Sequence, residues 1–407
     1  MVDIFDKTCD PTKLNELDIS CLLYADDLIL ISESEFGLQK CLDKLYTYCE
    51  KWNLAVNLDK TNVMVFNKSG RILNTYSFKF NDQVIELTSE YKYLGILFKP
   101  SGIFTNAINL LGKKASKAMF CIRKLLYSDR LNVLPYLKLF ETCIKPILLY
   151  CSEVWAPDLI VKDKSSLESK FLTISPVKFQ IKFAKYVLGV NKSAVNTAVL
   201  AELGMFPIAI DALKASVGFW FHLVNAKEHS FVMNAYKCSL NLANSFAAKM
   251  KRLFLKLGFD HIWDNQNSFS KKKLIKAIGN KMSEKYVDFW KNSPFNDQNN
   301  PNGNKLRTYR KLKKDYELEK YLLIDTDRCK ISNFVKLKIS NSKLYIEQGR
   351  HRNIPLDKRL CPLCKIEIED EFHFMLKCIK LADCRQRLFN QIATIIPSLV
   401  LCRRKKS

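Results

Sequence analysis

Two adjacent carboxylates, Asp26 and Asp27, stand between two apolar runs in the segment CLLYADDLILIS, residues 21–32. The short runs predict two strands joined by a tight turn. Neighbouring like charges repel, and at a rigid sheet edge they suit Mg²⁺, which takes one or two carboxylates together with substrate phosphate oxygens. Two such ions, ~3.5–4 Å apart, can stabilise both oxygens of a phosphoryl transfer. Asp is also a common turn residue, so an ordinary acidic hairpin explains the pair equally well.

A second group with chemical potential lies near the C-terminus. Cys361, Cys364, His373 and Cys378 follow the spacing C-x2-C-x8-H-x4-C. Three thiolates and one imidazole make a closed tetrahedral Zn²⁺ site, which is structural rather than catalytic. The segment CPLC predicts a metal knuckle, and EDEFHFML predicts the start of a helix that carries His373 toward it. The alternatives are a small cysteine-rich core with one buried histidine, or Cys384 as a substitute ligand.

The chain of 407 residues has a formal net charge of +24, which favours polyanionic partners. Nucleic acid is the first candidate partner and an anionic membrane surface is the second. The alternative is a soluble basic protein whose charge serves no specific partner. Residues 249–291 hold eleven Lys/Arg against four Asp/Glu, and residues 305–320 hold seven against three. The aromatic residues interleaved with these charges are Trp263, Phe269, Tyr286, Trp290, Tyr309 and Tyr316.

These basic segments predict a nucleic-acid interface, with cations on phosphates and aromatic rings stacked on unpaired bases. The competing interpretation is a solvated helix face whose aromatic residues lie in the core. For any single residue, this arrangement is commoner than a contact with nucleic acid. The tail RRKK at 403–406 resembles a weak nuclear-import signal. The candidate phosphate contacts are Lys271, Lys272, Lys273, Arg307, Arg310, Lys311, Lys313 and Lys314.

The sequence favours an intracellular protein, in the nucleus, the cytoplasm or both. No apolar run reaches the ~18 residues of a membrane span, and the N-terminal MVDIFDKTCD lacks a signal-peptide pattern. Fourteen cysteines without such a signal indicate a reducing compartment, where they are free thiols or metal ligands. No membrane partner is expected.

Periodicity predicts an α+β fold. A helix over 34–53, capped by Ser34, follows the acidic hairpin. A strand over 61–67, a hairpin over 76–87 that turns at Asn81-Asp82, and a strand over 91–98 come next. Helices are expected over 106–128 and 132–150, and mostly helical chain over 165–291. The Asn/Pro/Gly-rich 293–304 is the best linker, and a basic helix is expected over 305–321.

The segment YADD between apolar strands resembles the metal-binding hairpin of reverse transcriptases, most closely those of non-LTR (LINE-like) retrotransposons. WNLAVNLDKTNVMVF (52–66) is similar to the next family segment, where Lys60 would approach the leaving pyrophosphate. YKYLGILF resembles the primer grip, with Tyr93, Leu94 and Gly95. YLKLFETCIKPILLYCSEVW (136–155) is similar to the thumb, and patches at 182–208 and 343–364 also match.

The resemblance implies a partial palm over 1–100 and a helical thumb over 101–160. It also implies a basic helical domain over 161–292 and the linker 293–304. After these come a basic helical segment over 305–350 and a zinc module with a basic tail over 351–407. The implied partners are RNA and DNA. The implied cofactors are structural Zn²⁺ and, in an intact polymerase only, Mg²⁺ on Asp26 and Asp27, with Lys60 as general acid.

The family's active site also needs a third carboxylate, from an earlier strand with the pattern D-x-x-x-A-F-D. Only 25 residues precede Asp26, and Asp3, Asp6 and Asp10 lie in no strand-like run. The expectation is therefore a truncated reverse transcriptase that is inactive alone. The missing N-terminal part of the polyprotein is then an expected partner. The alternatives are a non-enzymatic, zinc-containing nucleic-acid-binding protein and a decayed element copy without function.

Overall fold

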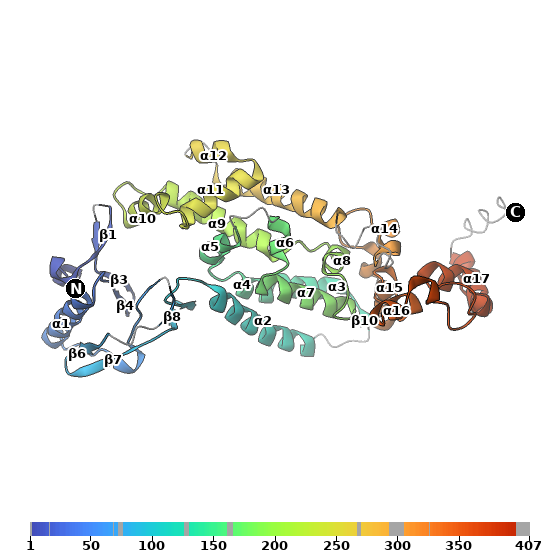
Figure 1. Ribbon diagram of the computed structural model, residues 1–407, viewed down its shortest axis with the longest axis horizontal. Coiled ribbons are helices and arrows are strands. Elements are labelled where there is room, and N and C mark those ends of the chain that lie inside the picture. The colour runs from blue at the N-terminus through green and yellow to red at the C-terminus, as the bar shows by residue number, and fades with distance from the viewer. Residues whose placement is uncertain are drawn as a thin grey trace. The chain divides into compact units, whose positions relative to one another are not determined.

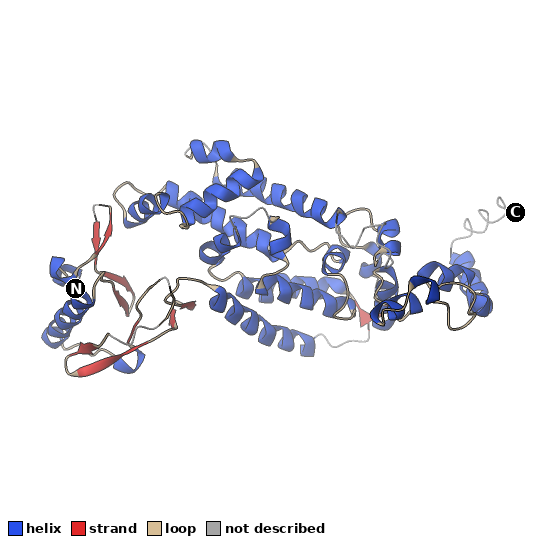
Figure 2. Cartoon of the chain, viewed as in Figure 1, coloured by secondary structure: helices blue, strands red, loops and turns tan. Residues whose placement is uncertain are grey.

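The structure is a computed structural model that describes residues 2–15, 17–67, 69–71, 76–125, 130–160, 166–266, 270–292, 305–324 and 326–395. It contains small sheets in the N-terminal hundred residues and is mostly helical afterwards (Figures 1 and 2), as the α+β prediction requires. The chain divides into two compact units. Unit 1 comprises residues 1–120, 142–179 and 208–283, and unit 2 comprises residues 121–141, 180–207 and 284–407. The expected linker at 293–304 and the tail at 403–406 lie outside the described residues.

The described strands are short and pair mostly as antiparallel hairpins, with β5 parallel to β7 in the one three-stranded sheet. They are β1 (Thr12–Leu14), β2 (Leu17–Ile19), β3 (Cys21–Tyr24), β4 (Asp27–Leu30), β5 (Asn62–Val63), β6 (Phe78–Phe80), β7 (Gln83–Leu87), β8 (Tyr91–Tyr93), β9 (Ile96–Phe98), β10 (Arg130–Leu131) and β11 (Thr326–Asp327).

The described α-helices account for most of the remaining chain. They are α1 (Glu35–Trp52), α2 (Thr105–Leu125), α3 (Val133–Leu139), α4 (Lys145–Leu148), α5 (Ser152–Trp155), α6 (Leu167–Phe171), α7 (Ser175–Leu188), α8 (Asn196–Glu202), α9 (Ile208–Val224), α10 (Phe231–Leu240), α11 (Phe246–Leu257), α12 (Asp260–Asp264), α13 (Lys271–Lys291), α14 (Arg307–Leu312), α15 (Arg328–Lys338), α16 (Tyr345–His351) and α17 (Ala382–Ile395).

Helix α1 covers the sheet formed by β5, β6 and β7. Ser34 caps the helix by accepting a hydrogen bond from the Gly37 amide, as expected. Apolar residues of α1 pack against those of the sheet and form the N-terminal core. Its buried members are Leu42, Leu45, Cys49, Val63, Phe78, Phe80 and Ile85.

Two of the three expected β-segments after α1 differ in extent from the structure. The hairpin with Asn81-Asp82 as its turn is present, with Phe80 opposite Gln83. The strand expected over 61–67 is only β5. The single strand expected over 91–98 is wrong, because β8 and β9 form a hairpin in which Tyr93 pairs with Ile96. Leu94 and Gly95 have φ values of 44° and 83°, so the chain reverses there.

The predicted helix over 305–321 is also largely wrong, because α14 ends at Leu312. The chain after it bends over 315–317 and forms a 3₁₀ turn, η7 (Lys320–Leu323). Tyr316 packs there on Phe206 with ring centroids 4.7 Å apart, and Leu318 bridges to Leu203. Burial of an aromatic ring outweighs the helix propensity of the Lys-rich segment.

Most aromatic residues of the basic segments lie in the protein core and cannot stack on bases. Tyr286 and Tyr309 are among the largest fully buried side chains, and Trp290 is 4% exposed. Trp290 lies edge-on to Tyr309 with ring centroids 6.4 Å apart. Trp263 stacks on the buried Trp220, and Phe269 lies outside the described residues. The interpretation as core residues is therefore correct for these rings.

A buried ion-pair network organises unit 2. Glu202 is fully buried, and its carboxylate lies 2.8 Å from the Lys338 ammonium and accepts a hydrogen bond from the Tyr321 hydroxyl. Lys338 also pairs with Glu319 at 3.2 Å, and Glu319 pairs with the buried Lys313 at 2.7 Å. Burial raises the pKa of Glu202. Each charge in the network therefore depends on its partner.

Replacing Lys338 by methionine should destabilise the protein by about 3–5 kcal/mol, because Glu202 would stay buried without its ammonium partner. Urea unfolding followed by circular dichroism measures the loss. The control is Lys330→Met at an exposed position of the same helix, which should change the free energy of unfolding by less than about 0.5 kcal/mol. Equal effects of the two substitutions would contradict the role assigned to Lys338.

Candidate functional site

The Asp26–Asp27 pair lies at the tip of the β3–β4 hairpin. Tyr24 pairs with Asp27, so Ala25 and Asp26 form the two-residue turn. Ala25 has φ 54°, a left-handed conformation that costs a non-glycine residue about 1–2 kcal/mol. Both carboxylates are exposed. The strained turn therefore presents two adjacent carboxylates to solvent, as the hairpin prediction requires.

Tyr150 closes over the turn of the β8–β9 hairpin. Its hydroxyl donates a hydrogen bond to the Leu94 carbonyl oxygen at 2.5 Å. A Cβ atom at Gly95 would lie 2.8 Å from that hydroxyl oxygen, so only glycine fits beneath Tyr150 without a shift. The neighbouring Cys151 thiol is the largest cause that raises the pKa of Tyr150, and the Tyr24 phenol is a weaker one. Tyr150 thus holds the turn of the β8–β9 hairpin.

Lys60 lies in the 3₁₀ turn η3 (Leu58–Lys60) and is exposed. Its carbonyl oxygen accepts a hydrogen bond from the Tyr91 hydroxyl at 3.2 Å. Tyr91 opens β8, and Tyr93 ends the same strand. The Lys60 turn is therefore attached to the β8–β9 hairpin, although no spacing in the sequence indicated the contact.

A third carboxylate does not join Asp26 and Asp27 within the described residues. Asp6 forms an ion pair with Lys44 at 2.6 Å, which is the first cause that lowers the pKa of Asp6. Asp10 has a left-handed backbone at the end of the 3₁₀ turn η2 (Lys7–Cys9). Among the described residues the candidate metal-binding group of three or more side chains is the Cys/His group near the C-terminus. The hairpin here supplies two carboxylates only.

The four predicted ligands Cys361, Cys364, His373 and Cys378 converge in unit 2. Their ligand atoms all lie within 4.8 Å of one another. Cys361 Sγ is 3.9 Å from Cys378 Sγ, and Cys364 Sγ is 3.3 Å from His373 Nε2. Tetrahedral coordination with Zn–S bonds of ~2.3 Å separates sulfur atoms by about 3.8 Å. These separations therefore fit one tetrahedral metal ion.

Two local turns of the chain bring the four side chains together. The Cys361 carbonyl oxygen accepts a hydrogen bond from the Lys365 amide at 2.8 Å. Lys365 has a left-handed backbone with φ 58°, so the chain reverses there and closes the knuckle. His373 begins the π-helical turn η9 (His373–Lys377), and Cys378 follows it directly. Cys384 is exposed and is not a member of the group.

Electrostatics around the group favour a bound cation. The Ile366 backbone amide, followed by that of Glu367, lowers the pKa of Cys364 to about 7 by hydrogen bonding, so its thiolate forms near neutral pH. His373 Nδ1 lies 3.2 Å from a Glu367 carboxylate oxygen. A carboxylate on Nδ1 leaves Nε2 free as a metal ligand and orients the ring.

Two predicted phosphate contacts are engaged inside the protein instead. Arg307 bridges Glu347 at 2.9 Å and Glu371 at 2.6 Å, and Glu371 precedes His373 by two residues. Lys313 is 4% exposed and pairs with Glu319. Among the other predicted contacts, Arg310 is half-buried and the exposed residues are Lys271, Lys272, Lys273, Lys311 and Lys314.

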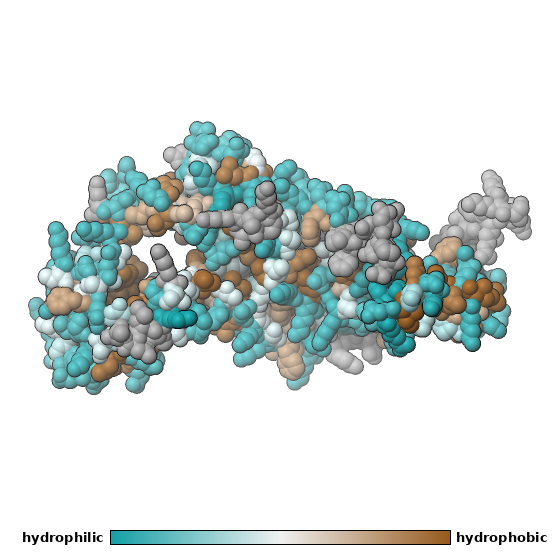
Figure 3. All heavy atoms as spheres, viewed as in Figure 1, coloured by the Kyte–Doolittle hydropathy of each residue, from teal (hydrophilic) through white to brown (hydrophobic). Residues whose placement is uncertain are grey.

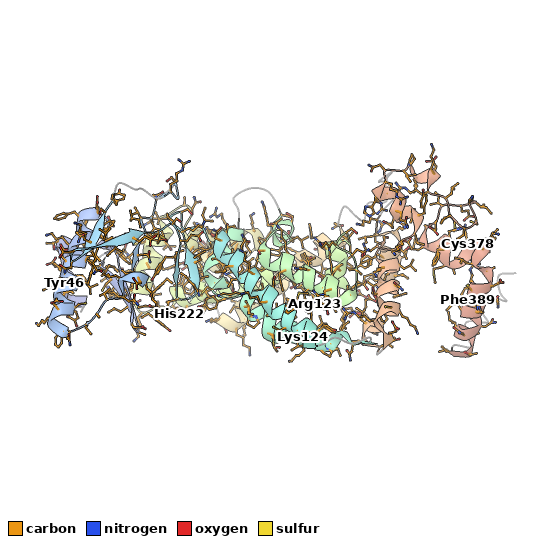
Figure 4. The ribbon with its side chains drawn as sticks, turned by 90° about the horizontal axis from the view of Figure 1, so that it is seen from below. Tyr46, Arg123, Lys124, His222, Cys378 and Phe389 are labelled. Atoms are coloured by element: carbon orange, nitrogen blue, oxygen red, sulfur yellow. The ribbon has the colours of Figure 1, made fainter. Side chains whose placement is uncertain are left out.

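Apolar side chains are exposed around the Cys/His group. Leu363, Ile366 and Ile379 are 49%, 64% and 63% exposed. Brown surface is visible over this part of the chain in Figure 3, and Figure 4 labels Cys378 there. Burial of these three side chains therefore contributes little to the stability of this module.

Comparison with known proteins finds reverse transcriptases similar to this chain. Residues 1–98 match the family described as "Reverse transcriptase (RNA-dependent DNA polymerase)". Over 155 residues the chain is 26% identical to the "RNA-directed DNA polymerase from mobile element jockey" of Drosophila melanogaster, covering 35% of this chain and 16% of that protein. The likeness to the "Probable RNA-directed DNA polymerase from transposon BS" of the same species is 27% over 139 residues, covering 32% and 15%. No solved structure is significantly similar.

Residues 1–98 are therefore similar to the reverse-transcriptase family, and the chain shows a distant similarity to non-LTR retrotransposon reverse transcriptases, as the resemblance in the sequence predicted. The aligned segment spans less than a fifth of the length of each of these relatives. Within the described residues, every helix is too short or too polar to traverse a lipid bilayer.

Tyr150→Phe should loosen the β8–β9 hairpin, because the Leu94 carbonyl oxygen would lose its side-chain donor. A lost hydrogen bond of about 1 kcal/mol corresponds to roughly fivefold faster amide exchange. Hydrogen exchange followed by mass spectrometry measures it on peptides over residues 90–99. Tyr24→Phe is the control, since no hydrogen bond of the Tyr24 hydroxyl exists among the described residues. Unchanged exchange in Tyr150→Phe would contradict the clamp.

Proposed function

We propose that this chain is part of an RNA-directed DNA polymerase of a non-LTR retrotransposon and acts on RNA and DNA inside the cell, in the nucleus, the cytoplasm or both. The observation that carries the proposal is the β3–β4 hairpin, which presents Asp26 and Asp27 at its tip inside the segment that matches reverse transcriptases. The +24 charge supports a polyanionic partner.

The proposed roles follow the arrangement around the two hairpins. Asp26 and Asp27 would hold the catalytic cation, and Lys60 would act as the general acid on the leaving pyrophosphate. Tyr93, Leu94 and Gly95 would position the primer end. The contact of Tyr91 with Lys60 supports part of this assignment, because it joins the Lys60 turn to the β8–β9 hairpin, whose turn Tyr150 holds at Leu94.

Mg²⁺ fits the hairpin only in part. It demands a near-ideal octahedral shell of oxygen atoms and gives up water reluctantly, whereas the described residues offer two adjacent carboxylates. Positioning and charge stabilisation are most of what a protein contributes to phosphoryl transfer. We therefore propose that the 407-residue chain alone does not polymerise, and that the third carboxylate comes from a further segment of the polyprotein.

Zn²⁺ fits the Cys/His group fully. Cys361, Cys364, His373 and Cys378 would fill its tetrahedral shell and leave no position for a substrate, so the ion would stabilise the fold and take no part in the reaction. The Glu367 contact with His373 and the short separations between ligand atoms support zinc.

A non-enzymatic nucleic-acid-binding protein is the second candidate function. It is favoured by the absence of a third carboxylate near Asp26 and Asp27 within the described part of the chain, and by the complete Cys/His group. Binding through exposed cations would survive without a catalytic centre. A decayed element copy would share these features and differ in having no selected role.

Primer extension separates the candidates. The isolated chain with an RNA template, a DNA primer, dNTPs and Mg²⁺ should give no product above that of Asp26→Ala. Loss of preorganised charge stabilisation typically costs about 10²–10³ in rate per group, and the described residues place no third carboxylate beside Asp26 and Asp27. Robust extension that Asp26→Ala abolishes would show that this chain supplies the third carboxylate itself.

Metal analysis tests the zinc proposal on the full chain. Reduced, folded protein should contain one zinc ion per chain by elemental analysis. Cys361→Ser and His373→Ala should lose it, and Glu367→Gln should weaken binding by about 10–100-fold, because His373 loses its orienting carboxylate. Cys384→Ser is the matched control and should keep the metal. Folded wild-type protein without zinc would refute the proposal.

A further inference from the structure

Two guanidinium groups lie against one tyrosine ring in unit 2. The Arg123 Cζ atom is 4.3 Å from the centre of the Tyr186 ring, and the Arg328 Cζ atom is 4.9 Å from it. Arg123 comes from the last turn of α2, Tyr186 from α7 and Arg328 from the first turn of α15. Figure 4 labels Arg123 and the adjacent Lys124 on α2.

Arg328 is fixed in place. Its Nη2 donates to the Tyr186 carbonyl oxygen at 2.9 Å, and its Nη1 donates to the Tyr136 hydroxyl at 3.1 Å. The nearest acidic residue along the chain, Asp327, is occupied as the cap of α15, where it accepts from the Cys329 and Lys330 amides. The Arg328 charge is thus oriented, and within the described residues no carboxylate forms an ion pair with it.

Arg123 is exposed, and within the described part of the chain its side chain has no ion pair and no hydrogen bond. All of its N–H groups are therefore available while the ring of Tyr186 supports its guanidinium plane. Lys182 is exposed one helical turn before Tyr186 on α7, on the same helix face. Cations gather here without a carboxylate among the described residues that pairs with either arginine.

Like charges held together without a counter-charge indicate an anion-binding site. Planar guanidinium groups match phosphate through parallel hydrogen bonds, and a stacked guanidinium loses less entropy on binding. The contrast with Arg307 is informative, since that guanidinium is already paired with Glu347 and Glu371. Arg307 therefore has little charge left for an anion, whereas Arg123 and Arg328 have no carboxylate partner among the described residues.

We infer that Arg123 and Arg328, stacked on Tyr186, bind a phosphodiester group of single-stranded nucleic acid. The inference rests on the proposed function for the presence of nucleic acid, and it assigns a contact outside the two Lys/Arg-rich segments. Arg123 supplies the free donors, Tyr186 orients its plane, and Arg328 contributes the second positive charge.

The test is binding of a fluorescein-labelled single-stranded RNA to the full chain, followed by fluorescence anisotropy between about 50 and 200 mM salt. Wild-type protein should bind with an affinity that falls steeply with salt. Arg123→Gln should weaken binding about tenfold and reduce the slope of log K against log salt by about 0.7, the value for one single-strand phosphate.

Lys124→Gln is the matched control, because it removes the same charge from the adjacent exposed position. It should change affinity by less than about twofold, as expected of an exposed charge without a specific partner. Arg123→Lys keeps the charge and should fail to restore wild-type affinity, since it loses the planar fork. Thermal unfolding of each variant identifies a merely structural effect, which would leave the salt slope unchanged.

The outcomes separate the two proposals. RNA binding by the wild type with equal losses in Arg123→Gln and Lys124→Gln would overturn the phosphate site and leave the proposed function in place. Full affinity of Arg123→Lys would also overturn it. Absence of RNA binding by the wild type would overturn the proposed function, and the phosphate site with it.

Discussion

A buried cation must be paired with an anion, and this constraint decides which charges of the protein remain available to a partner. Removing a charge from water costs several kcal/mol, which only a close counter-charge offsets. Lys338, Lys313 and Arg307 satisfy the constraint with Glu202, Glu319 and Glu371. Unit 2 therefore uses part of its positive charge to hold itself together, and only the exposed remainder can meet a polyanion.

The segment that matches reverse transcriptases, residues 1–98, depends instead on tight turns. The tips of β3–β4 and β8–β9 both contain residues with positive φ, at Ala25, Leu94 and Gly95. Tyr150 holds one of these turns through a single hydrogen bond and by filling the space above Gly95. Strain of this kind persists only when surrounding contacts enforce it. Tyr150 therefore contributes to the geometry of the turn at Leu94 and Gly95.

The Cys/His module has the opposite organisation. It exposes apolar side chains such as Ile366 and Ile379, and an exposed apolar side chain adds little to stability. Its polar contacts include the His373 ring, which lies against Glu367, and the Arg307–Glu371 ion pair. The thiols of the module converge beside them. A metal ion that joins the four ligand side chains would couple the folding of the module to its own binding.

The sequence by itself determined the features that are local. The Asp26–Asp27 hairpin, the capped helix α1, the Asn81-Asp82 turn and the C-x2-C-x8-H-x4-C group all follow from residue type and short spacing, since turns, caps and knuckles are formed by neighbours in the chain. The resemblance to reverse transcriptases also rested on such short segments.

Only the tertiary structure decided which side chains meet across long separations. It placed Tyr150 on Leu94, buried Tyr286 and Tyr309 in the core, and ended α14 at Leu312 because Tyr316 packs on Phe206. It also distinguished the neutralised Arg307 from the available Arg123, although both are arginines in basic surroundings. Burial and pairing depend on partners distant in sequence, and neither periodicity nor composition carries that information.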